Sequence, residues 1–357
     1  MPLLTRRTHV GTRGEPFDVP DGDGFVGVLL DGTRLVSVLS VTPPPPTPVL
    51  LPDGPRLRLP VDAISRCFAY TDARPARIDV VTRTLSSWGD GPATRAYRTV
   101  LGPLDPASHR SVALVIRVDP AQCASAVALR GGGAVGALRT ALWCIRRVVA
   151  AAAPHVGLRP LTAAALSTDA AWTLDARSEI AATLKPTGFH GVAPPVGGDG
   201  QVVGATESGA PIALCLAGPH IDRVDIAAQP SLIRQTAVRL AALGVRGHVV
   251  TDRHELWQPL AAAIDDPLLF GLGPAVPPTA QVLIRDVDEL DDSHEPRVSD
   301  PGLTELRVHR RDVRTSPGHF LLRQDLGDAS LMHLIAPDGV TTTVRTVSTP
   351  AERALTG

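Results

Sequence analysis

Apolar residues in the first part of the chain recur with spacings that predict a sheet with helices packed on it. Residues 25–41 contain two apolar runs joined by Asp31-Gly32, a dipeptide that favours a type I′ turn between two strands. Residues 77–85 alternate between apolar and polar positions, as a half-buried strand does, and residues 111–118 form a continuous apolar run. We expect residues 93–101, between these two strands, to form a helix. This succession of strands and helices indicates an α/β arrangement.

The longest predicted helix covers residues 134–153, directly after three consecutive glycines at 131–133. Several aliphatic residues lie on one side of this helix at spacings of three and four, so this side is expected to face the core. These residues are Leu138, Leu142, Ile145 and Val149. A further short strand is expected within residues 157–166.

The second half of the chain continues the mixture of strand and helix patterns. Residues 168–185 are expected to be helical, and residues 187–200 form a Gly/Pro-rich segment that is the best candidate boundary. Residues 331–347 are expected to form a hairpin around Asp338-Gly339. Between the boundary and this hairpin, strands are expected at 202–206, 212–216, 223–227, 245–251, 280–287, 306–309 and 320–325, and helices at 231–243 and 254–264.

Together these patterns predict an α/β fold of mixed sheets with packed helices, divided into two α/β subdomains. Residues 1–23 are polar and are expected to form a flexible arm. The N-terminal subdomain is expected to cover residues 24–186 and the C-terminal subdomain residues 201–357, with residues 187–200 as the linker. A chain of 357 residues is long enough to give both subdomains a core.

Composition and charge exclude some classes of function. The formal net charge of −1 gives no support to a nucleic-acid-binding protein. No segment has the ~20 apolar residues of a membrane helix, because Arg139, Arg146 and Arg147 interrupt the best candidate. The N-terminus also lacks the apolar core of a signal peptide. We therefore expect this chain to be soluble by itself.

The four cysteines favour neither a metal site nor a redox centre. Cys67, Cys123, Cys144 and Cys215 are far apart in the sequence and form no CxxC pair. This spacing fits reduced thiols in a cytosol, and we expect them to be buried among apolar residues.

Glycines at the start of the long helix match the GxGxxG pattern of dinucleotide-binding proteins. Gly131, Gly133 and Gly136 supply the pattern, but residues 121–130 separate them from the preceding strand. No Asp or Glu follows at about twenty positions, where a ribose-binding carboxylate is expected. We interpret the glycines as a tight turn before a helix, with an anion held by Arg130 and the helix N-terminus as the alternative.

Two acidic motifs in the second half are candidates for chemistry. Asp286 and Asp288 form a DxD, which metal-dependent glycosyltransferases use to hold a sugar nucleotide, but the surrounding charge run favours an exposed loop. Asp252 and Glu255 follow a predicted strand, and we interpret them as the N-cap and N3 residues of a capping box. The GxSxG, HExxH and P-loop motifs are absent from the sequence. We therefore assign no catalytic, cofactor-binding or metal-binding residue.

Four arginines at the long helix are candidate docking residues. Arg139, Arg146 and Arg147 fall near one another on the helix, and Arg130 precedes it. Guanidinium groups form forked bonds with carboxylates, so these residues could dock an acidic partner. The alternative is a solvated helix face that covers the core.

The sequences of several segments, and their order along the chain, resemble EccE, a component of the actinobacterial type VII (ESX) secretion membrane complex. The resemblance extends over residues 15–285 and is densest over residues 59–166. Its segments are EPFDVP, GVLLDGTRLVSVLSV, LPVDAISRC, ARIDVVTRT, LGPLDPASHRSVALVIRVDP, RGGGAVGALRTA, RPLTAAA and VVTDRHELWQPL.

This resemblance implies a non-catalytic structural subunit at the cytoplasmic face of the cell membrane, with no cofactor. It implies protein–protein contacts with EccB, EccC and EccD, of which EccC holds the ATPase activity. The alternative function is a nucleotide- or nucleotide-sugar-binding enzyme similar to glycosyltransferases.

The resemblance also implies how the membrane is reached. EccE proteins usually have two membrane helices before the region matched here, so we expect contact through partners or through anchor helices absent from this chain. Arg6, Arg7 and Arg13 would then be juxtamembrane basic residues that face anionic headgroups.

Overall fold

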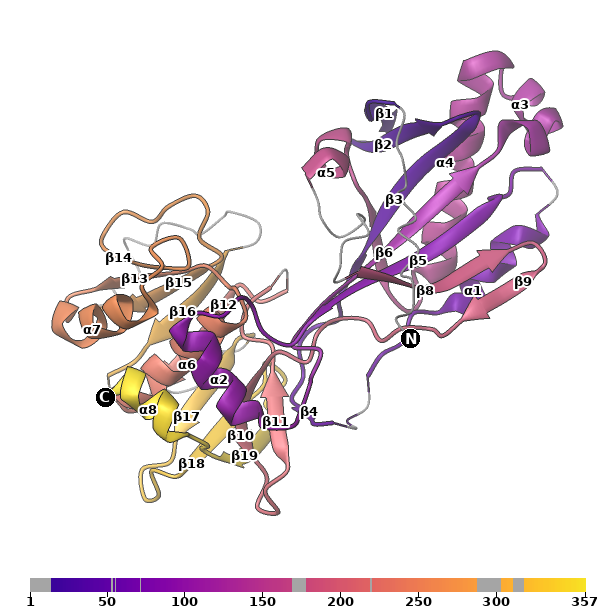
Figure 1. The fold of residues 1–357 in the computed structure, drawn as a ribbon. Helices are drawn as coiled ribbons and strands as arrows, with labels where there is room; N and C mark the ends of the chain where they lie inside the picture. Colours follow the sequence, from indigo (N-terminus) through magenta and orange to yellow (C-terminus); the bar gives the residue numbers. More distant parts are fainter. Residues whose placement is uncertain are drawn as a thin grey trace, which may run out of the picture. The chain divides into compact units, whose positions relative to one another are not determined.

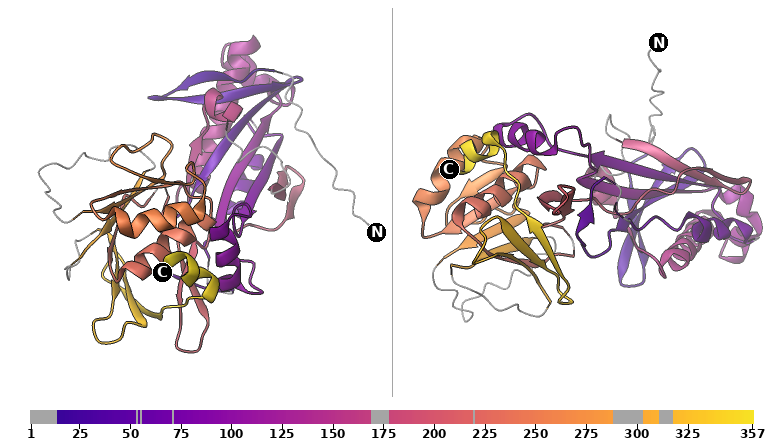
Figure 2. Two further views of the ribbon diagram at one scale, coloured as in Figure 1. Left: turned by 60° about the vertical axis from the view of Figure 1, so that its left-hand side comes forward. Right: turned by 90° about the horizontal axis from the view of Figure 1, so that it is seen from below.

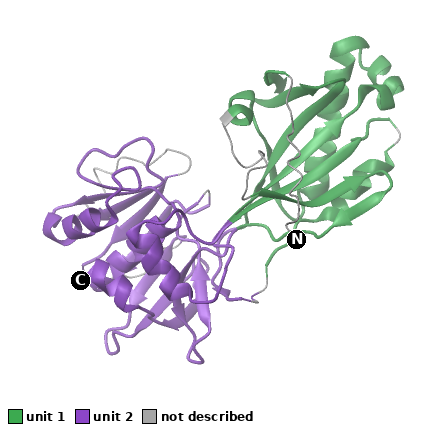
Figure 3. Ribbon diagram, viewed as in Figure 1, with its two compact units in different colours: residues 1–44, 56–84, 110–197 green, residues 45–55, 85–109, 198–357 purple. Residues whose placement is uncertain are grey.

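The computed structural model describes residues 14–52, 54, 56–70, 72–168, 178–218, 220–287, 303–310 and 318–357. Its contacts divide the chain into two compact units, each with a sheet and packed helices, so the predicted α/β fold is confirmed (Figure 3). Unit 1 comprises residues 1–44, 56–84 and 110–197, and unit 2 comprises residues 45–55, 85–109 and 198–357. The division into subdomains of residues 24–186 and 201–357 stays a prediction. In the structure, residues 45–55 and 85–109 belong to the same unit as residues 198–357.

Unit 1 is built on one sheet with the strand order β1-β2-β3-β6-β5-β8-β9, and β7 also pairs with β3. Apolar residues of β3 face both sides of this sheet, because Leu35 and Leu39 belong to one core while Val36 and Val38 belong to the other. The strands are β1 (Phe17–Asp21), β2 (Gly24–Asp31), β3 (Arg34–Thr42), β5 (Arg77–Leu85), β6 (His109–Val118), β7 (Gly157–Pro160), β8 (Ser178–Lys185) and β9 (Gly188–Gly191).

Helices cover the unit 1 sheet, with α4 (Gly133–Ala152) as the longest (Figure 1). The buried residues of α4 pack in the larger core together with α1 (Val61–Ser65), the 3₁₀ helix Arg66–Ala69 and α3 (Ala124–Leu129). The short helix α5 (Ala163–Thr168) contributes Leu166 to the smaller core on the other side.

Unit 2 contains a mixed sheet with the order β14-β13-β15-β16-β12-β17-β18-β19-β10-β11-β4. The pairings from β14 to β17 are parallel, and the ladders from β17 to β4 are antiparallel. The strands are β4 (Val49–Leu50), β10 (Gln201–Ala205), β11 (Pro211–Leu214), β12 (Arg223–Ala227), β13 (Gly247–Thr251), β14 (Phe270–Leu272), β15 (Val282–Asp286), β16 (Thr304–Val308), β17 (Phe320–Gln324), β18 (Leu331–Ile335) and β19 (Thr341–Arg345).

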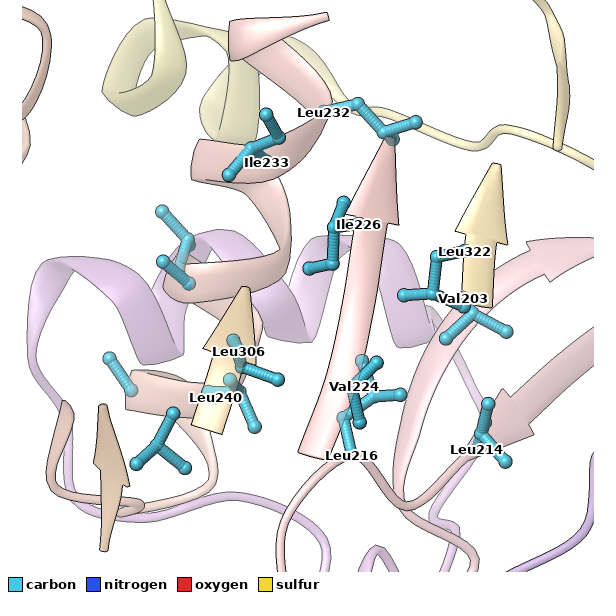
Figure 4. Close-up of a cluster of buried hydrophobic side chains, with 14 of the residues drawn as sticks. Val203, Leu214, Leu216, Val224, Ile226, Leu232, Ile233, Leu240, Leu306 and Leu322 are labelled. Atoms are coloured by element: carbon cyan, nitrogen blue, oxygen red, sulfur yellow. The ribbon is translucent and has the colours of Figure 1, made fainter. Parts of the chain in front are cut away.

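Four helices pack on one face of the unit 2 sheet (Figure 2). They are α2 (Pro92–Leu101), α6 (Pro230–Ala242), α7 (His254–Ile264) and α8 (Pro350–Thr356). Figure 4 shows Val224 and Ile226 of β12 in the core with Ile233 and Leu240 of α6. The alternation along β12 therefore directs Arg223 and Asp225 to the opposite face of the sheet.

The first hairpin forms where expected but with a different turn. β2 and β3 pair antiparallel, and Asp31 lies opposite Arg34 across a loop of Gly32 and Thr33. Gly32 has a φ of 63°, whereas Thr33 is not among the residues with positive φ. A type I′ turn requires positive φ at both loop residues, so the predicted turn type is wrong. Glycine at the first loop position is typical of a type II′ turn.

Residues 168–185 are a second correction. The helix α5 ends at Thr168, residues 169–177 lie outside the described residues, and Ser178–Lys185 form the strand β8. This strand pairs antiparallel with β5, and its Ala182 and Leu184 are buried in the larger core of unit 1. Burial of alternate side chains explains why the segment is a strand despite its helix-forming composition.

Two segments assigned to an arm and a linker also contain strands. Residues 17–21, in the predicted flexible arm, form β1 and pair antiparallel with β2. Residues 188–191, in the predicted linker, form β9 and pair antiparallel with β8. Backbone pairing with a neighbouring strand, which is independent of side-chain polarity, accounts for both differences.

Candidate docking surface

The helix α4 has a buried face and an exposed face, as its sequence pattern predicts. Leu142 and Ile145 are buried, Val149 is partly buried against the same core, and Leu138 packs beside them. The exposed side of the helix presents Val135, Arg139, Trp143 and Arg146. The aliphatic side therefore covers the core as expected, and docking of a partner by the exposed arginines stays a prediction.

A compact group of charged and aromatic side chains lies where α4 passes the 3₁₀ helix Arg66–Ala69. We call it the arginine–aromatic cluster, and it consists of Tyr70, Asp72, Arg130, Trp143 and Arg147. The Cζ atom of Arg147 lies 4.0 Å from the centre of the Tyr70 ring and 5.3 Å from that of Trp143. The Cζ atom of Arg130 lies 5.8 Å from the centre of the Trp143 ring. Both guanidinium groups therefore contact aromatic surface.

Asp72 joins the two arginines. Arg147 Nη1 donates to Asp72 Oδ1 at 2.7 Å, and Arg130 Nη2 donates to Asp72 Oδ2 at 3.3 Å. The hydrogen bond from Arg147 is the main reason that the pKa of Asp72 falls from 3.8 to about 2. One carboxylate faces two guanidinium groups, so the cluster retains a positive charge at neutral pH.

The predicted docking arginines do not form a single group. Arg130 and Arg147 meet in the cluster, whereas Arg139 is exposed and donates from Nη1 to the carbonyl oxygen of Arg130 at 3.2 Å. Arg146 pairs with Asp21 of β1, to which its Nε donates at 2.8 Å. Arg6, Arg7 and Arg13 lie outside the described residues.

Sequence reasoning missed the other members of this cluster. Trp143 lies four residues before Arg147 and four after Arg139, a spacing that places these side chains on one helix face. That spacing was a usable signal for Trp143. Tyr70 and Asp72 reach the cluster only through the packing of another segment, and the sequence contains no local signal for this contact.

The backbone conformation and the helix packing explain why glycine occupies the positions of the GxGxxG pattern. Gly131, Gly132 and Gly133 have φ values of 106°, 65° and 51°, a left-handed sequence that favours glycine at each position. A Cβ atom on Gly136 would overlap with the backbone oxygen of Val127, so glycine at this position allows α3 and α4 to approach closely. Both observations support the interpretation as a tight turn before a helix.

Asp286, the first residue of the DxD, is buried rather than in an exposed loop, so that expectation is wrong for this residue. It ends β15, and Arg253 Nη2 donates to its Oδ1 at 2.5 Å while Trp257 Nε1 donates to its Oδ2 at 2.8 Å. Arg310 lies beside the same carboxylate, with Nε 3.5 Å from Oδ1. Asp288 lies outside the described residues.

The capping-box interpretation of Asp252 and Glu255 is wrong. The N-cap residue of α7 is Arg253, and no side chain caps this end of the helix. Asp252 instead forms an ion pair with Arg310. The ion pair with Arg310 is a charge-assisted interaction that competes with capping for the Asp252 carboxylate.

A second charged group lies on the face of the sheet opposite the helices. His309 Nε2 lies 2.6 Å from Asp225 Oδ1, and Arg223 donates to the same oxygen from Nη2 at 2.7 Å. Burial alone would raise the pKa of Asp225, but the hydrogen bonds from His309 and Arg223 outweigh it and lower the pKa. Among the described residues, no group of three or more His, Cys, Asp or Glu could hold a metal ion.

The cysteines are free thiols, and three of them are buried. Cys67, Cys123 and Cys144 lie in the larger core of unit 1, while Cys215 of unit 2 is partly buried. Burial raises the pKa of Cys144 and of Cys215 to about 12 and also raises the pKa of Cys67. The prediction of buried thiols is confirmed for the three residues in unit 1.

Comparison with known proteins finds a described family for one segment of the chain. Residues 106–188 match the family described as "Putative type VII ESX secretion system translocon, EccE". The match supports assignment of the chain to the type VII secretion system as one of its components. Over these residues the match confirms the resemblance to EccE seen in the sequence. No curated protein matches the chain.

The matched segment includes β6, α3, α4, β7, α5 and β8 of the fold. Arg130, Trp143 and Arg147 of the arginine–aromatic cluster therefore lie in it. Within the described part of the chain, none of the helices has the length and apolar character needed to cross a bilayer.

Proposed function

We propose that this protein is a non-catalytic structural subunit of the ESX membrane complex that acts at its cytoplasmic face. In this proposal it binds EccB, EccC or EccD through the arginine–aromatic cluster. The observation that supports it most directly is that the family match covers Arg130, at the end of α3, together with Trp143 and Arg147 of α4. The juxtamembrane role of Arg6, Arg7 and Arg13 is part of the same proposal.

The chemistry of the cluster suits a protein interface. Trp, Tyr and Arg are the residue types enriched at the energetic centres of interfaces. Tyr70 and Trp143 are both exposed, and Arg147 is held between them by stacking and by Asp72. A side chain that is already held in place loses less conformational entropy on binding. The remaining positive charge favours an acidic surface on the partner.

An enzyme that binds a nucleotide or a nucleotide sugar is the rival function. Its strongest candidate site is the carboxyl edge of the parallel strands, where Asp286 lies. The Asp286 oxygens there accept bonds from Arg253 and Trp257, so this carboxylate is engaged within the protein. This observation favours a structural role for Asp286 over binding of a sugar nucleotide.

Capture of the chain by a detergent-solubilised EccB–EccC–EccD complex tests the proposal. The chain should be used with and without an added N-terminal membrane anchor. Arg147→Glu and Trp143→Ala should each weaken capture by about thirtyfold, as the loss of an interface centre does. Arg345→Glu is the matched control, because Arg345 is an exposed arginine of unit 2 and should leave capture unchanged.

Two results would contradict the proposal. Equal capture of the wild type, Arg147→Glu and Arg345→Glu would show that the arginine–aromatic cluster is not part of the interface. If neither form of the chain is captured, and a nucleotide or nucleotide sugar raises the thermal midpoint by several degrees, the rival enzyme function is supported instead.

A further inference from the structure

The turn between α3 and α4 exposes aliphatic side chains to solvent. We call residues 128–135 the α3–α4 apex, and its sequence is ALRGGGAV. Leu129 is 85% exposed and Val135 is 55% exposed. Arg130 is the only residue of the apex with a polar side chain. Aliphatic groups so exposed, one on each side of a single turn, are unfavourable in water unless another surface covers them.

The sequence around the apex is basic. Residues 120–168 contain five arginines and no Asp or Glu, although the whole chain has a net charge of only −1. Asp21 and Asp72 reach this region from elsewhere in unit 1 and pair with Arg146 and with the cluster arginines. Arg139 stays close to the apex, since its Nη1 donates to the carbonyl oxygen of Arg130. The apex is therefore an aliphatic tip with basic groups around it.

The dimensions of this arrangement fit a lipid surface. Arg139 follows Val135 by four residues, which corresponds to about 6 Å along the axis of a helix. The headgroup layer of a bilayer is also about 6 Å thick. With α4 perpendicular to the bilayer, Leu129 and Val135 can reach the hydrocarbon boundary while the backbone of Arg139 lies at the outer edge of the headgroup layer. The guanidinium group of Arg139, which bonds the carbonyl oxygen of Arg130, then lies within that layer. The helix α4 begins at the apex without a side-chain cap, so its positive end faces the same layer.

We propose that the α3–α4 apex docks onto a membrane surface rich in anionic lipids. Aliphatic groups with surrounding arginines are the combination that binds peripherally to such surfaces. An apex made of glycines and aliphatic side chains also offers few hydrogen bonds to a protein partner. The inference rests on the proposed location at the cytoplasmic face, but it concerns a different contact from the one made with the other subunits.

Vesicle co-sedimentation of the full chain, in the absence of other subunits, tests this contact. Vesicles of phosphatidylcholine are compared with vesicles of an equal mixture of phosphatidylcholine and phosphatidylglycerol. The wild type should bind only the mixed vesicles, and salt should weaken the binding. Leu129→Gln combined with Val135→Gln should weaken it about tenfold. Arg139→Gln should weaken it about fivefold.

Two further variants make the result specific to the apex. Leu326→Gln is the matched control, since Leu326 is 91% exposed in unit 2 and its replacement should leave vesicle binding unchanged. Leu129→Trp should strengthen binding, because tryptophan favours the membrane interface.

Absence of wild-type binding to the mixed vesicles would overturn the proposal, as would equal weakening by Leu326→Gln. If vesicles are not bound and the Leu129/Val135 variant loses capture by the detergent-solubilised subunits, the apex is a protein contact and the lipid proposal fails. Capture in detergent and binding to pure vesicles are separate measurements, so failure of one proposal is distinguishable from failure of the other.

Discussion

Arg239 of α6 and Glu352 of α8 form a buried, forked ion pair. Arg239 Nε donates to Glu352 Oε1 at 2.7 Å, and Nη2 donates to Oε2 at 2.9 Å. The side chains are 2% and 0% exposed. Gln235 donates to the same carboxylate at 2.6 Å, and Arg239 Nη1 donates to the carbonyl oxygen of Val202 at 2.6 Å. This network connects the last helix of the chain to the core of unit 2.

Removal of one partner of this pair should destabilise unit 2. Glu352→Ala leaves the Arg239 guanidinium buried without its carboxylate, so the free energy of unfolding should fall by about 3–5 kcal/mol. Urea denaturation followed by circular dichroism measures the loss. Glu207→Ala, at an exposed position, is the control and should change stability little. A loss of under about 1 kcal/mol for Glu352→Ala would contradict a structural role for the pair.

The pKa of Asp72 reports directly on the arginine–aromatic cluster. Its lowering to about 2 depends chiefly on Arg147, so Arg147→Met should raise the pKa towards 3.8. Since the pKa in the folded state is the lower one, the stabilising contribution of Asp72 is present above about pH 4 and is lost as the pH falls towards 2. Carbon-detected NMR titration of the carboxyl group measures both values. An unchanged pKa in Arg147→Met would show that the hydrogen bond is absent in solution, and Arg345→Met is the control.

The thiols of Cys144 and Cys215 should react slowly in the folded protein. Cys144 and Cys215 have a pKa of about 12, so almost no thiolate is present at pH 8. Alkylation by iodoacetamide at this pH should modify both residues far more slowly than in urea, and peptide mass spectrometry identifies the sites. Because their pKa is higher in the folded state than the ordinary 9.0, these thiols should stabilise the protein below pH 9 and lose this effect towards pH 12. Equal rates of alkylation with and without urea would contradict the raised pKa of these two thiols.

Local patterns predicted most of the elements that enclose the cores. The amphipathic spacing of residues 134–153 identified α4, because a helix of this length repeats its pattern over several turns. The glycines before it were correctly interpreted as a turn, since their distance from the preceding strand excluded the nucleotide-binding arrangement. The same reasoning failed for Ser178–Lys185, where pairing with β5 determines the conformation.

The candidate site could be predicted only in part. Arg147 was identified on the long helix and Arg130 directly before it, but their meeting at Asp72 depends on a segment 75 and 58 residues away in the chain. For Asp286, the local sequence indicated the wrong environment. Its acidic surroundings indicated an exposed loop, whereas Arg253 and Trp257 from a neighbouring strand–helix unit bury and satisfy its carboxylate. Contacts of this kind arise from the packing of elements and have no signature in local sequence.

The close approach of α3 to α4 makes Gly136 a test of how the apex is supported. A Cβ atom at this position would overlap with the backbone oxygen of Val127, so Gly136→Ala must push the two helices apart. We expect a loss of about 1–3 kcal/mol in the free energy of unfolding, despite the higher helix propensity of alanine. Gly91→Ala is the control, because Gly91 has a φ of −64° and open space around its Cα. Chemical denaturation measures both variants. If Gly136→Ala were as stable as the wild type, α3 would not pack against α4 as described, and the apex would lack the fixed geometry on which lipid docking depends.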